Sequence, residues 1–265
     1  LYFTFSLSDA GSTSSQIGRQ LLLRTQISLL NVDLANVSAS ADHVRAAVYY
    51  GRRDVRVEEV PAIRRPGSDE VVLDVVRAAI CGTDSGEWAH GPLTSAANRP
   101  HPVTGHRGPV VLGHEFVGVV REIGDEVRGI ERGQRVVPGC GAWCGQCRLC
   151  QGGRTQLCRN RYLIGMHRDG GLAEAAVVPA EMCRPVEAGV GDDAAAIAQP
   201  LAVALHGLNR AAPEPGSTLV VIGAGGIGSL VVAAASIRGH RVIAIDPSRP
   251  RLRRARELGA DHAFE

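Results

Sequence analysis

The sequence predicts two kinds of domain in succession, a β-rich, barrel-like domain and then the beginning of a parallel α/β domain. The first is indicated by short segments in which apolar and polar residues alternate between glycines and prolines. The second is indicated by a change to helical periodicity after Asp192, followed by two pairs of strand and helix. We place the β-rich domain at residues 44–196 and the α/β domain at residues 197–265.

The β-rich domain contains six segments with the alternation and the β-branched content of half-buried strands. Glycine or proline lies close to an end of each segment, where the chain is expected to turn. The segments are residues 45–49, 55–60, 70–79, 116–123, 135–138 and 173–179.

The α/β domain begins with a helical pattern over residues 192–208. Its later elements are a strand at 219–222, a helix at 226–237, a strand at 242–245 and a helix at 250–258. This order starts a doubly wound Rossmann sheet, which normally has about five or six strands. Because only one strand, helix and strand unit is formed by residue 265, we expect the Rossmann domain to be truncated at its C-terminal end.

Composition favours a soluble globular protein. The chain has 265 residues, of which 45% are hydrophobic, and its formal charge of +2 gives no general attraction to nucleic acid or to an anionic membrane. Four of its seven cysteines have metal-type spacing and no signal-peptide pattern opens the chain, which favours a reducing cytoplasm.

Two segments need separate interpretation. Residues 218–237 carry no charge and are long enough to span a bilayer, but their glycines and β-branched residues favour a buried strand, a tight turn and a helix. Residues 1–43 are Ser-rich and share no motif with the rest of the chain. We interpret them as an atypical N-terminal extension, for which disorder, upstream translated sequence and a transit peptide are the alternatives.

Four cysteines form a Cys-x-x-Cys-x-x-Cys-x7-Cys run: Cys144, Cys147, Cys150 and Cys158. The alternatives are disulfides, an iron–sulfur cluster and zinc. The short spacings strain a disulfide framework, and the final gap does not match the bacterial ferredoxin pattern, so we favour zinc. Four thiolates leave no open position on a tetrahedral ion, which predicts a structural site. Cys140 precedes the run by four residues, but the even spacing favours Cys144 as its first ligand.

A second candidate metal site combines Cys81 with His114 and Glu115. A single cysteine or histidine is more often a packed core residue than a ligand. Together, and upstream of a nucleotide motif, the three become a stronger candidate. A thiolate, an imidazole and a carboxylate hold zinc while leaving a position for water or substrate.

A G-x-G-x-x-G motif predicts a dinucleotide-binding turn between the strand at 219–222 and the helix that follows. Its residues include Gly223, Gly225, Gly226, Ile227 and Gly228. Gly223 would make the turn, Gly225 would let the backbone approach a pyrophosphate, and Gly228 would let the helix pack on its strand. A turn that binds no nucleotide is the alternative.

Asp246 ends the next strand and follows Gly228 by 18 residues, near the separation expected for a residue that binds the adenosine ribose. Its charge favours NAD over NADP, because a 2′-phosphate would meet a carboxylate. Five arginines between residues 249 and 256, among them Arg251, complicate this choice. They are either phosphate ligands or a solvated helix face.

Taken in order, the motifs CGTD, LGHEF, the four-cysteine run and VIGAGGIG followed by IAID resemble the zinc-dependent medium-chain alcohol and polyol dehydrogenases. The segment His101–His106 is similar to a longer loop of the 2,3-butanediol dehydrogenase branch. The resemblance implies a GroES-like catalytic domain, a Rossmann domain and an active site in the cleft between them.

The resemblance also implies roles for individual residues. Cys81 and His114 are carried over as catalytic zinc ligands, and Glu115 as a ligand or an exchangeable neighbour. Thr83 is the first hydroxyl of a proton relay, and Asp84 orients the zinc-bound histidine.

The chain departs from the family at Gln199, where polyol-type relatives usually have a glutamate. A neutral amide is a poorer zinc donor than a carboxylate. We therefore assign the third protein ligand to Glu115 and expect Gln199 to hold water or a substrate hydroxyl.

The expected function is hydride transfer between a secondary alcohol or small diol, similar to 2,3-butanediol, and NAD. Two zinc ions per chain, one catalytic and one structural, are expected. The implied partner is the small substrate, and neither nucleic acid nor a membrane is expected to bind. The full-length protein is expected to form a homo-oligomer, either a dimer or a tetramer. The alternatives are a truncated, inactive dehydrogenase that keeps its zinc lobe and, more remotely, a zinc-ribbon interaction module. Acidic residues nearly balance the arginines, which argues against the last.

Overall fold

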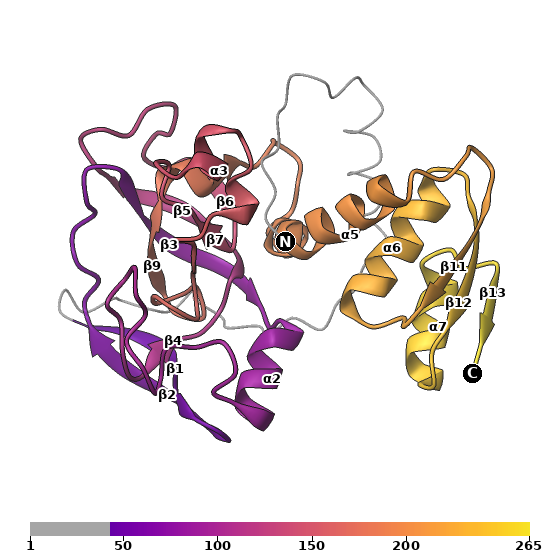
Figure 1. Cartoon of the computed structure of the whole chain (residues 1–265), viewed down its shortest axis with the longest axis horizontal. Helices are drawn as coiled ribbons and strands as arrows, with labels where there is room; N and C mark the ends of the chain where they lie inside the picture. Colours follow the sequence, from indigo (N-terminus) through magenta and orange to yellow (C-terminus); the bar gives the residue numbers. More distant parts are fainter. Residues whose placement is uncertain (1–42) are drawn as a thin grey trace. The chain divides into compact units, whose positions relative to one another are not determined.

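The computed structural model describes residues 43–265, which divide after Gln199 into two compact units (Figure 1). The first unit contains residues 43–199 and the second contains residues 200–265. The expected N-terminal extension lies outside the described residues, apart from His43. No helix in the described part of the chain combines the length and apolar character needed to cross a membrane.

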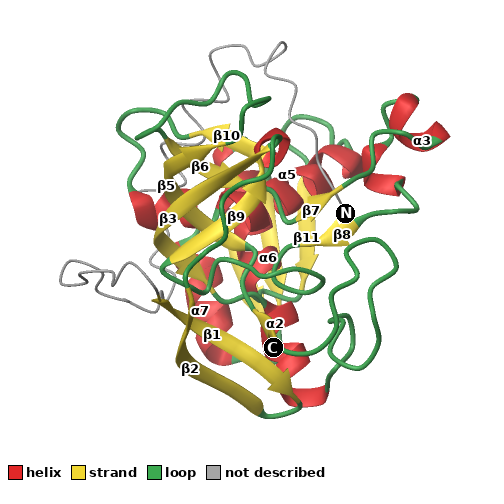
Figure 2. Ribbon diagram, turned by 90° about the vertical axis from the view of Figure 1, so that its left-hand side faces the viewer, coloured by secondary structure: helices red, strands yellow, loops and turns green. Residues whose placement is uncertain are grey.

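A five-stranded antiparallel sheet forms the centre of the first unit (Figure 2). Its order is β10-β6-β5-β3-β9, with β10 at Cys183–Pro185, β6 at Arg135–Pro138, β5 at Glu115–Ile123, β3 at Glu70–Ala79 and β9 at Ala175–Pro179. Val71, Leu73 and Val75 of β3 pack with Phe116 of β5 and with Ile164 in a buried core. These apolar side chains stabilise the strands by removing their surface from water.

A smaller antiparallel sheet has the order β2-β1-β4, with β1 at His43–Gly51, β2 at Asp54–Pro61 and β4 at Val110–Val111. Two short strands, β7 at Gly141–Ala142 and β8 at Tyr162–Leu163, form a separate pair. The short helical elements of the unit are α2 at Gly82–His90, α3 at Arg148–Gln151, η2 at Thr155–Leu157, η3 at Ala180–Met182 and α4 at Asp192–Ala196.

Helix α2 was not predicted, because its glycines and serine resemble a loop. It begins at Cys81, whose backbone N–H donates to Asp84 Oδ2 at 2.9 Å. An acidic side chain in the first turn suits the positive end of a helix. The interaction that starts this helix therefore also fixes the backbone of Cys81.

Glycines fix the chain immediately before His114. Gly113 has a φ of +99°, and its carbonyl accepts a hydrogen bond from Gly171 N at 2.9 Å. A Cβ atom at Gly165 or Gly170 would lie 2.6 or 2.1 Å from the same carbonyl oxygen. Since real side chains do not approach so closely, only glycine permits this packing.

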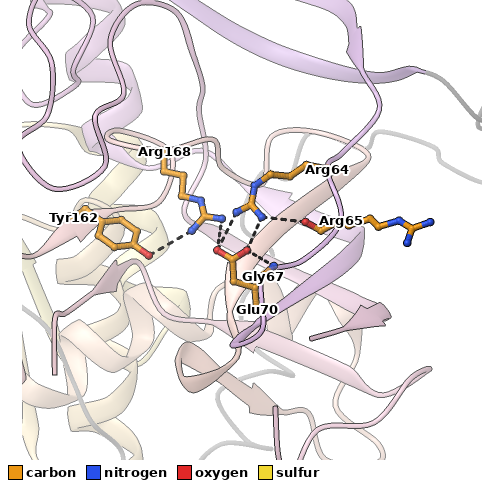
Figure 3. A network of polar contacts seen from close by, with 6 residues as sticks. All are labelled: Arg64, Arg65, Gly67, Glu70, Tyr162 and Arg168. Carbon is orange, nitrogen blue, oxygen red and sulfur yellow. Dashed lines mark hydrogen bonds and ion pairs between the residues drawn. The ribbon is translucent and has the colours of Figure 1, made fainter. Parts of the chain in front are cut away.

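Glu70, at the start of β3, joins distant parts of the first unit through a network of polar contacts (Figure 3). Its carboxylate pairs with Arg64 at 2.7 Å and with Arg168, and accepts from Gly67 N at 2.8 Å. Burial raises the pKa of Glu70, but Arg64, Gly67 N and Arg168 outweigh it and lower the pKa to about 2. Arg168 also donates to the Tyr162 hydroxyl at 3.4 Å.

The second unit is a parallel sheet with the order β11-β12-β13, formed by β11 at Thr218–Ile222, β12 at Arg241–Ile245 and β13 at His262–Phe264. Helices α6, Gly226–Ile237, and α7, Arg249–Glu257, pack on it and share its core with the end of α5, Ala198–Ala211. Side chains on the strands alternate between two faces. Val220 and Ile222 project away from this core and are 55% and 81% exposed.

The predicted elements of this region agree with the structure except near residue 197. The helical pattern over residues 192–208 is divided in the structure, because the chain leaves helical geometry at Ile197 and separates α4 from α5. The uncharged stretch at 218–237 divides into β11, a glycine turn and α6.

We predict that Glu70→Gln destabilises the fold at pH 7 by roughly 1–3 kcal/mol, since two arginines lose a charged partner. The pKa of about 2 lies below the ordinary value of 4.5, so the carboxylate stabilises the fold above about pH 4.5. That stabilisation is lost as the pH falls through 2. Denaturant unfolding at several pH values measures it.

The difference in unfolding free energy between the wild type and Glu70→Gln should shrink from pH 7 toward pH 2. Glu59→Gln, at an exposed carboxylate on β2, is the matched control and should have little effect at either pH. A difference that does not change with pH would contradict this role of Glu70.

Candidate metal centres and dinucleotide turn

The structure brings Cys81, His114 and Glu115 together at one edge of the five-stranded sheet. The pairing of β3 with β5 places Ala79 opposite Glu115. Cys81 lies two residues after the end of β3 and His114 lies directly before β5, so both meet Glu115 at that edge. One ligand atom from each of the three side chains lies within 4.8 Å of the others. Their convergence follows from strand register, although the residues are far apart in sequence.

The three side chains are shielded from water. His114 and Glu115 are only 7% and 6% exposed, and Cys81 is half-buried. Burial raises the pKa of Cys81 to about 11 and also raises the pKa of Glu115. Burying such groups is costly unless they are paired or bind a metal. Ligands of this kind release protons when a divalent ion binds, so the donor set fits zinc.

The carboxylate of Asp84 lies near His114 Nδ1. Asp84 Oδ1 is 3.7 Å from His114 Nδ1, and both atoms are buried without a hydrogen-bond partner among residues 43–265. A small rotation would let Nδ1–H donate to the carboxylate. Nε2 would then be the nitrogen available to a cation, as in many histidines that bind metals.

Thr83 is exposed and lies beside Cys81, with Cys81 Sγ 3.6 Å from Thr83 Oγ1. Gln199, in the first turn of α5, donates from Nε2 to the sulfur of Cys140 at 3.4 Å. No sequence pattern predicted this contact, because Cys140 lies outside the four-cysteine run and 59 residues before Gln199.

The four cysteines of the predicted structural site also come together. All four sulfur atoms lie within 4.8 Å of one another. The separations are 3.5 Å for Cys147–Cys150, 3.5 Å for Cys144–Cys158 and 4.0 Å for Cys144–Cys150. Zinc–sulfur bonds of about 2.3 Å in a tetrahedron require sulfur separations of about 3.8 Å.

The chemistry of these thiols also fits a metal. The seven cysteines, all within residues 43–265, are free thiols. Cys144 N lies 3.4 Å from Cys158 Sγ and donates to it, and the backbone N–H of Cys150 helps lower the pKa of Cys147 to about 6, whereas burial raises the pKa of Cys150 to about 12. Backbone donors of this kind favour thiolates, the form that binds zinc.

The glycine motif forms a tight turn between β11 and α6. Gly223 has a φ of +90°, Gly225 is the N-cap of α6, and Gly226 and Ile227 begin the helix. A Cβ atom at Gly228 would lie 1.7 Å from Gly223 O, so the turn requires glycine there. The helix N-terminus offers the backbone N–H groups that bind phosphates in dinucleotide sites.

Asp246 follows β12 and holds this turn. Its carboxylate accepts from Ala224 N and Ser248 N, both at 2.8 Å, and it is only 2% exposed. The hydrogen bond from Ser248 N is the main cause of its lowered pKa. Arg251 Nη1 lies 3.6 Å from Asp246 Oδ2, and its guanidinium group is 3.9 Å from the position of a Cβ on Gly225. Asp246 and Arg251 therefore lie together at the turn.

Comparison with known proteins gives a consistent family. Residues 67–188 match the model of the alcohol dehydrogenase GroES-like domain. The chain is 36% identical over 214 residues to 2-dehydro-3-deoxy-L-galactonate 5-dehydrogenase of Pseudoalteromonas atlantica, covering 81% of this chain and 60% of that relative. The chain thus spans about 60% of the length of this curated relative.

Two solved structures extend the likeness to the fold. The crystal structure of 2R,3R-butanediol dehydrogenase from Bacillus subtilis has a TM-score of 0.77 at 29% identity, covering 83% of this chain and 63% of its own. A dehydrogenase of Sinorhizobium meliloti, assigned to the zinc-binding class and bound to NADP, has a TM-score of 0.71 at 34% identity, covering 83% and 61%.

These likenesses confirm the predicted order of a GroES-like domain followed by a Rossmann domain. The chain belongs to the zinc-dependent medium-chain dehydrogenase family.

Proposed function

We propose that this protein is a zinc-dependent oxidoreductase that transfers hydride between a secondary alcohol or small diol and NAD. The observation that carries the proposal is the convergence of Cys81, His114 and Glu115 at one edge of the sheet, in a chain that also forms a dinucleotide turn. One thiol, one imidazole and one carboxylate leave a zinc position open, which suits catalysis. The four-cysteine cluster supplies no open position and is proposed as structural.

Cys81, His114 and Glu115 would hold the catalytic zinc, which supplies Lewis acidity that lowers the pKa of a substrate hydroxyl. Asp84 supports Cys81 through its backbone N–H, and after a small rotation it would orient His114 through Nδ1. A partner of this kind fixes the ring and its protonated nitrogen.

Thr83 is proposed to receive the proton that the substrate hydroxyl loses. Its hydroxyl lies next to Cys81 and is exposed, so it can accept a proton on one side and pass one to water on the other. Hydride transfer itself is the chemistry of the nicotinamide, which the protein binds and positions.

The glycine turn and Asp246 are proposed to bind NAD. The carboxylate lies next to Ala224 N in the turn, where it can accept from ribose hydroxyls. Its negative charge opposes a 2′-phosphate. The Sinorhizobium relative binds NADP, so Arg251, beside Asp246, is the residue that would favour NADP if the preference were reversed.

The relatives are named for a sugar-acid derivative and for a small diol, which supports a substrate of the alcohol or polyol class. A small vicinal diol is our proposed substrate. We also propose a cytoplasmic location, because the cysteines have metal-type spacing, and a homo-oligomer, dimer or tetramer, for the full-length protein.

We predict that Cys81→Ser lowers alcohol-dependent NADH formation by more than about a hundredfold and removes one of two zinc ions. Loss of a direct ligand should exceed the 10–100-fold effect typical of residues that only support a ligand. Metal analysis and absorbance of NADH measure the two outcomes. Cys183→Ser, at a buried cysteine outside both clusters, is the control and should keep both zinc ions. Full activity of Cys81→Ser would exclude this site.

We predict that Asp246→Asn weakens NAD binding by about tenfold or more, because a hydrogen bond to a charged group contributes about 1.5–3 kcal/mol. Binding of NADP should weaken less or improve, since the charge opposed to its 2′-phosphate is gone. Calorimetric titration with both nucleotides measures the ratio. An equal loss for NAD and NADP would show that Asp246 only supports the turn.

A further inference from the structure

Cys140 lies at the sheet edge that carries the proposed catalytic site. β5 pairs with β6 at Gly118–Val136 and Val119–Arg135. Continued past the ends of both strands, this antiparallel register places Cys140 opposite His114. A second contact agrees, because Cys140 O accepts from Ile164 N at 3.0 Å, and the next residue, Gly165, packs on Gly113.

The side chain of Cys140 has a specific partner. Its sulfur accepts a hydrogen bond from Gln199 Nε2 at 3.4 Å. Burial raises the pKa of this thiol and the charge of Glu115 raises it further, whereas the hydrogen bond from Gln199 lowers it, so the thiol lies within the electrostatic reach of Glu115. The Cys140–Gln199 pair is therefore a neighbour of the three proposed ligands.

The direction of this hydrogen bond decides what Gln199 offers to the site. A glutamine amide has one oxygen, which accepts hydrogen bonds or binds a cation, and one NH2 group, which only donates. If Nε2 faced a cation, the contact would be repulsive. Because Nε2 is used by Cys140, Oε1 is the atom left for other partners.

We propose that Cys140 is a positioning residue that holds the Gln199 amide with Oε1 toward the metal centre of Cys81, His114 and Glu115. The neutral oxygen would then support the bound zinc, either directly or through a water molecule. This inference rests on the proposed function, since it needs a metal at that centre. It assigns to Cys140 a role that is separate from the four-cysteine cluster.

The test is a measurement of zinc affinity at the weaker of two sites in the full chain, by competition with a chromophoric chelator. Cys140→Ala should weaken zinc binding by about 10–100-fold, the usual effect of losing a residue that supports a ligand. Cys140→Ser should stay within about threefold of the wild type, because a hydroxyl also accepts from Nε2. Cys183→Ala, which removes a buried thiol whose contact is Pro179 O, should leave the affinity unchanged.

A double-mutant cycle shows whether the two residues act together. Gln199→Ala should weaken zinc binding about as much as Cys140→Ala, and the double variant should lose no more than either single variant. Additive losses would overturn the proposal, as would wild-type affinity in Cys140→Ala. So would a Cys140→Ser variant as weak as Cys140→Ala.

The failure of this inference can be told apart from the failure of the proposed function. A wild-type chain that binds a single zinc ion would contradict the catalytic centre itself and the role of Cys140 with it. A wild-type chain that binds two zinc ions, with no change in Cys140→Ala, would contradict only the role of Cys140.

Discussion

The register between β3, β5 and β6 is the constraint on which the candidate catalytic site depends. These strands are neighbours in one antiparallel sheet, and their ends bring Cys81, His114, Glu115 and Cys140 to the same edge. A shift of one residue between two such strands would turn each side chain to the opposite face. The buried valines and Phe116 prevent that shift, because it would expose them to water. The apolar core thus sets the position of the polar site.

The backbone around the site is fixed by contacts that involve few side-chain atoms. Gly113 is enclosed by Gly165, Gly170 and Gly171, so His114 starts from a rigid point. On the other side of the site, the hydrogen bond from Cys81 N to Asp84 fixes the start of α2. Side chains that are held in place before a metal ion binds lose little conformational freedom when it binds. This geometry suits a site whose ligands must keep a fixed position through a reaction.

Much of the site and the sheet could be predicted from local sequence. The bounds of β3 and α6 agree with the alternation of residues 70–79 and the apolar run after the glycine turn. The four-cysteine cluster follows from short spacing, because a single short loop can enclose one ion. The Gly228 requirement also follows from the motif, since its packing partner is only five residues away. These features depend on neighbours in the chain.

Other features depend on contacts that no local pattern encodes. Glu70 and Arg168 are 98 residues apart, and Cys140 and Gln199 are 59 apart. The two residues of each pair come together only after the strands have paired and the segments that follow them have folded back onto the sheet. Helix α2, in contrast, had a local start signal in the capping-box spacing of Cys81 and Asp84, and it was missed because its glycines and serine resemble a loop. The break at Ile197 also had a local signal, because Pro200 has no N–H to donate to Ala196 O and its ring would clash with that carbonyl in a continuous helix.

In the function proposed for it, one chain holds two zinc ions in different ligand environments. X-ray absorption at the zinc edge of the zinc-loaded chain measures the sulfur ligands of both ions together. We expect five sulfur ligands for two zinc ions, four from the cysteine cluster and one from Cys81, with nitrogen and oxygen ligands completing the second ion. A chain that binds one zinc ion, surrounded by four sulfur atoms and nothing else, would exclude the second metal centre.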